Sequence, residues 1–251
     1  MYANIVGGSC GGEVTRDCRV VLKDVTILDT LVGACSNYGV VGGSSYIYAT
    51  SLHMPGDYYE EKKMNPSYNG EGNVTLTEST IITGGSNNGS VTNTYVYLSG
   101  DSDVWDVQGA GRRGASTVTN TSNVEVSGNA WVKHVVCGSV TDGLNGSSTT
   151  SASNECVKNT NITIKDSAKA ASVFGAGYDT FYKATYSSMY DGGTITINIK
   201  DNCTVGYVYG GGYRGSVGYM QGNGTNPDPI DAVIINQIGR ASCRERVWLR
   251  V

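Results

Sequence analysis

Ile162-Thr-Ile-Lys-Asp166 and Ile197-Asn-Ile-Lys-Asp201 are near copies of one short pattern, and they lie 35 residues apart. In each copy, a β-branched residue and a second aliphatic residue flank one variable position, and a polar pair that suits a turn follows. This alternation places the two apolar side chains on one face of a strand and the residue between them on the other. The pattern therefore predicts a short strand that ends at a polar corner.

Four more segments share this pattern, so the chain contains an internal repeat. They begin at Val20, Val74, Val96 and Val124. After the polar corner, further apolar residues and then a glycine recur in the same order, as at Val107 and Gly109. The distance between successive anchors varies from 22 to 54 residues. Constant strands joined by segments of variable length are typical of a solenoid.

The repeats predict an all-β fold: a single-stranded parallel β-helix (β-solenoid) with variable loop insertions at one corner. One rung cannot bury its own apolar face, whereas stacked rungs pair in parallel and enclose a continuous core. Glycine is expected at the corners because it adopts backbone angles that a side chain forbids. A β-propeller is the alternative, but its blades need about 40 residues each, and the shortest repeat has 22.

The composition agrees with a turn-rich β protein and excludes several classes of function. The chain has 251 residues, with 35 Gly and 16% charged residues, which disfavours a helical bundle. No apolar run approaches the length of a membrane span, so no membrane insertion is expected within this sequence. The net charge of -4 and the lack of a basic stripe make nucleic acid an unexpected partner.

The domain prediction is one β-helix fragment over residues 1–236, of about seven rungs and truncated at both ends. Ile5-Val-Gly-Gly8 is interpreted as the end of a rung, and Ala232-Val-Ile-Ile-Asn236 as the start of one. Residues 237–251 break with the preceding composition. Within them, Ile238-Gly-Arg-Ala-Ser-Cys-Arg-Glu-Arg-Val247 matches the translation of a common synthetic sequencing adapter. This segment is therefore interpreted as an artefact and left out of the fold.

Six cysteines precede that segment, and two disulfides are considered. Cys137 with Cys156 would close the excursion between them, and Cys10 with Cys18 would close the first rung. The alternative is that each cysteine is a small buried residue of a reduced protein. Six cysteines allow 15 pairings, so the sequence leaves the connectivity open. With two histidines and no Cys-x-x-Cys motif, no metal site is expected.

The search for catalytic residues finds no candidate. His134 is expected on the surface of a regular strand, and no Gly-x-Ser-x-Gly motif is present. Asp101 and Asp103 form a tight acidic pair at a corner, where two carboxylates are usually solvated. The run from Gly109 to Gly114 resembles a phosphate loop, but it lacks the Lys and the helix that such a loop needs. No catalytic residue and no cofactor are therefore predicted.

The long excursions are rich in tyrosine and are predicted to carry the contact surface. One runs from Ser36 to Gly72 and another from Tyr178 to Tyr190. Tyrosine combines a flat apolar face with a polar tip, which suits contact with sugars and protein surfaces. The alternative is that these tyrosines only cover the outside of the coil. The candidate ligand-binding residues are Tyr58, Tyr59, Tyr68, Tyr182 and Tyr186.

The corners Val173-Phe-Gly-Ala-Gly177 and Val208-Tyr-Gly-Gly-Gly-Tyr-Arg-Gly215 resemble those of the repetitive surface β-helix proteins of gut bacteria, often called adhesin-like. The resemblance covers nearly all of residues 1–236 and is one of composition. It implies an exported protein, extracellular or on the cell surface, and the adapter-like segment fits a metagenomic origin.

The expected function is non-catalytic: adhesion or spacing, with host or microbial glycans or surface proteins as partners. The alternative is a carbohydrate-active β-helix enzyme, a polysaccharide lyase or glycoside hydrolase, with an incomplete active site in this sequence. Such an enzyme is expected to stack acidic or basic residues on consecutive rungs, and the sequence pattern predicts no stack of that kind.

Overall fold

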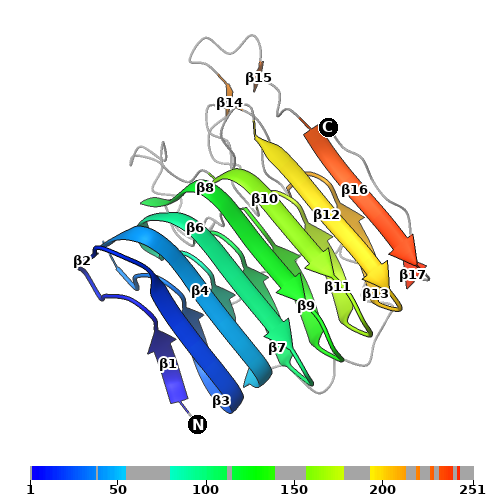
Figure 1. Cartoon of the computed structure of the whole chain (residues 1–251), viewed down its shortest axis with the longest axis horizontal. Coiled ribbons are helices and arrows are strands. Elements are labelled where there is room, and N and C mark those ends of the chain that lie inside the picture. The colour runs from blue at the N-terminus through cyan, green and yellow to red at the C-terminus, as the bar shows by residue number, and fades with distance from the viewer. Residues whose placement is uncertain are drawn as a thin grey trace, which may run out of the picture.

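A computed structural model of the chain consists of strands and their connections (Figure 1). It describes residues 2–37, 39–54, 80–111, 115–138, 157–177, 193–212, 219–220, 227–228, 232–239 and 242–243. Within these ranges there is no helix, so the prediction of an all-β fold is confirmed. It follows that none of the described elements is a helix that could cross a membrane.

Fifteen strands belong to one sheet, whose pairings are parallel. The strands of a first ladder lie side by side at the front of Figure 1. In spatial order they are β3 (Cys18–Val32), β4 (Gly39–Met54), β6 (Asn88–Ser99), β8 (Ala115–Val126), β10 (Val157–Ile164), β12 (Thr194–Asp201) and β16 (Ala232–Gly239).

A second ladder lies behind the first and continues from β3. Its strands are β5 (Ile81–Thr83), β7 (Asp103–Gln108), β9 (Trp131–Val136), β11 (Lys169–Phe174), β13 (Thr204–Tyr209) and β17 (Ser242–Cys243). Because β3 pairs with both β4 and β5, and β7 pairs with both as well, these four strands close a ring that joins the ladders.

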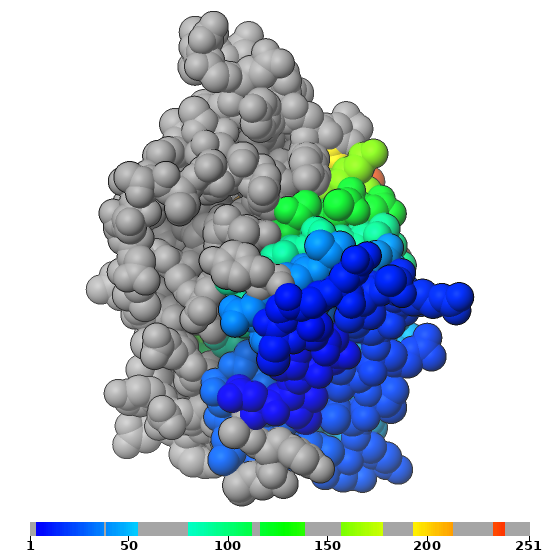
Figure 2. Space-filling model, turned by 90° about the vertical axis from the view of Figure 1, so that its left-hand side faces the viewer, coloured from blue at the N-terminus to red at the C-terminus, as the bar shows by residue number. Residues whose placement is uncertain are grey.

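Four short strands lie off this path. β1 (Tyr2–Val6) pairs with β3, and β2 (Glu13–Val14) pairs with β4. β14 (Tyr219–Met220) and β15 (Pro227–Asp228) form a separate antiparallel pair. Figure 2 views the molecule from its N-terminal end, with the first strands in blue in front of the later ones.

The core is built from apolar side chains that recur once per strand and stay in register. In the first ladder the in-register residues are Val20, Ile47, Val96, Val124, Ile162, Ile197 and Ile235. In the second ladder they are Leu31, Ile82, Val107, Val135, Val173 and Val208. All of them belong to or pack against one hydrophobic cluster. Each fully buried aliphatic side chain contributes about 1.5–3 kcal/mol relative to exposure.

One anchor of the predicted repeat is wrong. Ile47 pairs with Val20 on one side and with Val96 on the other, so it holds the place in the ladder that the repeat assigned to Val74. Val74 itself lies outside the described residues. Ile47 escapes the pattern because the second aliphatic position holds the small Ala49. The predicted excursion from 36 to 72 is therefore partly wrong, since β4 occupies residues 39–54 of it.

The prediction that all variable segments lie at one corner is wrong. Residues 139–156 and 178–192 each connect a strand of the second ladder to the next strand of the first. Residues 55–79 instead interrupt the second ladder itself, because His53 and Met54 at the end of β4 and all of β5 pair with the same strand, β7. The insertion points therefore differ between rungs.

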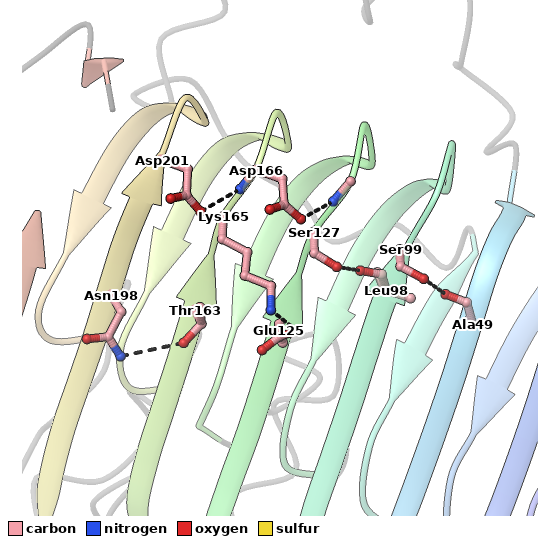
Figure 3. A network of polar contacts seen from close by, with 11 residues as sticks. Ala49, Leu98, Ser99, Glu125, Ser127, Thr163, Lys165, Asp166, Asn198 and Asp201 are labelled. Carbon is pink, nitrogen blue, oxygen red and sulfur yellow. Dashed lines mark hydrogen bonds and ion pairs between the residues drawn. The ribbon is translucent and has the colours of Figure 1, made fainter. Parts of the chain in front are cut away.

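Six rungs turn at the polar corner through a residue with positive φ. This residue is the fourth after the apolar anchor, with φ between 52° and 67°: Asp24, Ser51, Gly100, Gly128, Asp166 and Asp201. Left-handed backbone favours Gly, and tolerates Asp because its short side chain can hydrogen-bond locally. Asp166 Oδ2 accepts a hydrogen bond from the N–H of Gly128 at 2.9 Å, and Asp201 Oδ2 accepts one from the N–H of Asp166 at 3.2 Å (Figure 3). Aspartate thus links this corner to the preceding rung.

The glycine-rich corner has a different cause from the one predicted. Gly109 and Gly175 have no positive φ, so left-handed backbone is not the reason for glycine there. A Cβ atom on Gly109 would lie only 2.5 Å from Ser122 Oγ and 2.8 Å from a methyl carbon of Val124. The N–H of Gly109 also donates to the carbonyl of Val136 at 2.7 Å. Glycine is needed here because neighbouring rungs approach too closely for a side chain.

Strand structure continues past the predicted domain boundary at Asn236. β16 pairs with β12 as far as Gly239, and β17 pairs with β13. Residues 237–239 and 242–243 therefore keep the register of the preceding rung.

Candidate functional site

The outward side chains of the first ladder form flat files, because the register repeats from strand to strand. One file contains Arg19, Tyr46, Tyr95, Asn123, Asn161, Thr196 and Ile234. The next contains Val21, Tyr48, Tyr97, Glu125, Thr163, Asn198 and Asn236. Successive members are about 4.8 Å apart, the usual strand separation. The result is a surface of aromatic rings at one end and amides at the other.

Four tyrosines from β4 and β6 form a compact block. The rings of Tyr46 and Tyr95 are stacked at a centroid distance of 4.8 Å, and those of Tyr48 and Tyr97 at 5.0 Å. The guanidinium of Arg19 lies over both Tyr46 and Tyr48, 5.2 Å and 5.8 Å from their ring centroids. We call these four tyrosines the tyrosine block.

The tyrosine block presents ring edges rather than ring faces to solvent. Parallel rings only 4.8 Å apart cannot lie side by side in one plane, so they stand upright and stack face to face. Arg19 covers the face that remains at one end of the block. Partial burial, followed by the charges of Tyr48 and Glu125, raises the pKa of Tyr97 above its ordinary value. The block therefore clamps two rungs together and offers hydroxyl groups, while the ring faces between the two strands and on the Arg19 side are closed to a sugar.

Asparagine continues these files over the later rungs. Asn161 Nδ2 donates to Asn123 Oδ1 at 3.3 Å, and Asn236 Nδ2 donates to Asn198 Oδ1 at 2.9 Å. Asn198 Nδ2 also lies 3.5 Å from Thr163 Oγ1, and the Lys165 ammonium lies 2.8 Å from Glu125 Oε1 (Figure 3). In these contacts, outward amide, hydroxyl and charged groups of neighbouring strands bind one another.

A different set of outward side chains lies at the start of the second ladder. His53, Asp103, Trp131 and Lys169 stand in register on β4, β7, β9 and β11. We call these four residues the axial file, because they run along the direction in which the rungs stack. Trp131 is half-buried and Lys169 is exposed. Lys169 has no ion pair with any residue that the structure describes.

Asp103 is the one acid of the axial file, and its surroundings shift its pKa. Its side chain is 11% exposed, and its Oδ2 lies 4.0 Å from His53 Nδ1. Burial raises the pKa of the Asp103 carboxyl to about 6. The expectation that the acidic pair at this corner is solvated therefore holds for the exposed Asp101 but is wrong for Asp103.

Trp105 and Lys133 lie next to the axial file, two residues after Asp103 on β7 and two residues after Trp131 on β9. Trp105 is buried, and its ring centroid lies 6.3 Å from that of Trp131. The Lys133 ammonium is 3.7 Å from the Trp105 centroid, within the range of a cation–π interaction. The aromatic pair therefore fixes the orientation of Trp131, while Lys133 occupies one face of Trp105.

A second group of polar side chains lies further along the same strands of the second ladder. Asp106, His134 and Ser172 are in register on β7, β9 and β11, and all three are buried. His134 Nδ1 and Ser172 Oγ share a hydrogen bond of 2.5 Å. Burial, and to a smaller extent the charge of Lys133, lowers the pKa of His134 to about 3. We call these three residues the buried row.

The buried row overturns two predictions. His134 is only 4% exposed, so the expectation of a surface position is wrong. Acidic and basic residues also do stack on consecutive rungs, in the axial file and in the buried row. The pattern missed both sets because it classified each residue by its distance from an anchor, and outward positions of the second ladder were assumed to face solvent.

The predicted contact residues lie outside the described part of the chain. These are Tyr58, Tyr59, Tyr68, Tyr182 and Tyr186. Their assignment therefore stays a prediction. The repeated Tyr-aliphatic-Tyr triplets at 46–48 and 95–97 were the available signal for the tyrosine block. For the axial file, the signal was the recurrence of polar or aromatic residues one position before Val104, Val132 and Ala170.

The proposed disulfides are not formed among the described cysteines. Cys10, Cys18 and Cys137 are free thiols, and Cys156 lies outside the described residues. The Cys137 thiol donates to the carbonyl of Ser122 at 3.2 Å, and burial raises its pKa to about 11. Over the described ranges, no group of three or more His, Cys, Asp or Glu side chains is placed to hold a metal ion.

No family model matches the chain, and neither does any curated protein or solved structure with which it was compared.

Proposed function

We propose that this chain is a segment of a parallel β-helix that acts outside the cell or on its surface, in adhesion or as a spacer. The observation that carries the proposal is the constant register of the first ladder from β3 to β16, despite connections of very different length. In such a scaffold, further rungs can be added with the same core residues. The connecting segments can change in length and sequence without disturbing the core.

Glycans or surface proteins are the partners that this function implies. The tyrosine hydroxyls of the outward files repeat from strand to strand, which suits contact with ligands rich in hydroxyl groups. The tyrosine-rich segments at Tyr58, Tyr59, Tyr68, Tyr182 and Tyr186 remain the second candidate contact region.

Binding to glycans and cells tests this function. The purified chain is applied to a glycan array and to intact cells, and the variant Tyr58→Ala/Tyr59→Ala is compared with Tyr97→Phe, which removes one hydroxyl from the tyrosine block. Loss of binding in the first variant, with an unchanged melting temperature, supports the loop assignment. If the wild-type chain binds neither glycans nor cells, the adhesion proposal fails and only the spacer role is left.

The second candidate function is carbohydrate cleavage, and one specific observation favours it. Asp103 combines a raised pKa with a place beside the half-buried ring of Trp131, and a general acid is expected to titrate near its working pH. Incubation with pectic and mucin glycans distinguishes the two functions. New reducing ends or unsaturated products that disappear in Asp103→Asn would establish the enzyme, whereas stable substrates would leave the binding module.

A further inference from the structure

We propose that the axial file is a binding site for an uncharged sugar residue of a glycan, with the sugar ring against Trp131 and its hydroxyl groups between Asp103 and Lys169. The inference rests on the proposed function and deepens it, because it names a site and a ligand class for the adhesive surface.

The first step of the argument is the order of the side chains. Asp103, Trp131 and Lys169 occupy matching positions on three neighbouring strands, so the aromatic residue lies between an acceptor and a donor. Neighbouring strands are about 4.8 Å apart, which is close to the width of one sugar ring. A ring centred on Trp131 therefore reaches a carboxyl group on one side and an ammonium group on the other.

The second step is the aromatic ring itself. In the tyrosine block, the facing sides of the rings cover each other, and Arg19 covers the outer side of Tyr46 and Tyr48. Trp131 meets Trp105 at an interplanar angle of 54°, so the two indoles do not stack face to face. Since Trp131 is half-buried rather than buried, part of its indole remains at the surface. Indole rings give the largest apolar contact of any side chain and are favoured as anchors in binding sites.

The third step concerns charge. Lys169 is exposed and makes no ion pair with a described residue, so its three donors are available to a ligand. On the opposite side of the ring, Asp103 Oδ1 is buried, which leaves Oδ2 as the acceptor that Asp103 offers. One donor group and one acceptor group suit the paired hydroxyls of a neutral sugar, whereas an acidic sugar would face the carboxylate of Asp103 as well as the ammonium of Lys169.

Calorimetric titration tests the site. The probes are neutral gluco-, galacto-, manno- and xylo-oligosaccharides, with polygalacturonate as the acidic comparator. Trp131→Ala should weaken binding of the best neutral probe at least tenfold, as for a central aromatic anchor. Lys169→Gln should weaken it roughly tenfold. Lys23→Gln, which removes the same charge from an exposed position on β3, should leave the affinity unchanged.

A second measurement guards against variants that fail to fold. Binding of a neutral probe should change the intrinsic fluorescence of the wild-type chain, and this change should be lost in Trp131→Phe, which retains an aromatic ring. Affinity for the neutral probe should also be nearly independent of salt, because little charge is neutralised.

Three results would overturn the assignment. Unchanged affinity in both Trp131→Ala and Lys169→Gln would remove the site while leaving glycan adhesion by another surface intact. Binding of polygalacturonate alone, with strong salt dependence, would refute the neutral ligand class. If the wild-type chain binds no probe and no array glycan, both this inference and the glycan-binding form of the proposed function fail.

Discussion

Acid should destabilise this protein through His134, because the folded state disfavours a proton on its imidazole. Burial lowers the pKa of His134 from 6.5 to about 3. Below pH 6.5 the unfolded chain binds a proton at this residue, and the folded chain does not do so until about pH 3. The free energy of unfolding therefore falls as the pH falls through this window. Between about pH 7 and about pH 4.5, the two pKa values correspond to a loss of roughly 2.5 kcal/mol.

Urea unfolding of the wild type and of His134→Asn at these two pH values measures the effect. Asparagine can still share a hydrogen bond with Ser172, but it cannot take up a proton in this range. The wild type should lose roughly 2.5 kcal/mol more than the variant on acidification. Asp103 titrates in both proteins, so its contribution cancels in the comparison. Equal losses in the two proteins would show that His134 is not held neutral by burial, and the reasoning would be refuted.

Three other substitutions probe different parts of the fold. Asp103→Asn should raise the free energy of unfolding at neutral pH by roughly 3 kcal/mol. The reason is that a carboxyl whose folded pKa is raised from 3.8 to about 6 destabilises the fold as the pH rises through this window. The gain should vanish near pH 4 in the same urea assay. Gly109→Ala should cost more than about 2 kcal/mol through the clash at Ser122 Oγ, and a double-mutant cycle with Ser122→Ala should recover part of that loss, whereas simple additivity would contradict the clash. Ile164→Ala should cost about 2–5 kcal/mol by leaving a cavity in the core, while Thr163→Ala on the outer face should change thermal stability by less than about 1 kcal/mol.

The inner half of the fold could be predicted from the sequence, because burial enforces a strict alternation. The anchors from Val20 to Ile197 follow it, and their parallel register is as expected. Ile47 was missed because the second apolar position of its strand holds Ala49, which is buried in the core but is smaller than the Val, Leu or Ile that the pattern required. Corner positions were predictable by composition only: glycine recurs at both corners, but a positive φ explains Gly100 and steric closeness explains Gly109.

The candidate sites were less predictable, because they depend on which residues become neighbours across strands. His53 and Asp103 are 50 positions apart in the sequence and yet lie in register. The spacing between anchors varies from repeat to repeat, so it does not predict this pairing. The burial of His134 could not be predicted either, since an outward position on a strand is expected to be solvated unless something covers it. Sequence periodicity thus gives the register within a rung, whereas the variable insertions hide which residues of successive rungs are paired.

The polar residues of the second ladder have a cost that folding alone does not explain. Directly beside the buried row, the next outward file holds the apolar Val136 and Phe174, so the same face accepts hydrophobic side chains. A neutral buried histidine and an acid with a raised pKa both lower the free energy of unfolding near neutral pH or below it. Positions where a sequence departs from what stability favours are concentrated at functional sites. This cost points to the second ladder, rather than to the self-satisfied amides of the first, as the surface on which function should be sought.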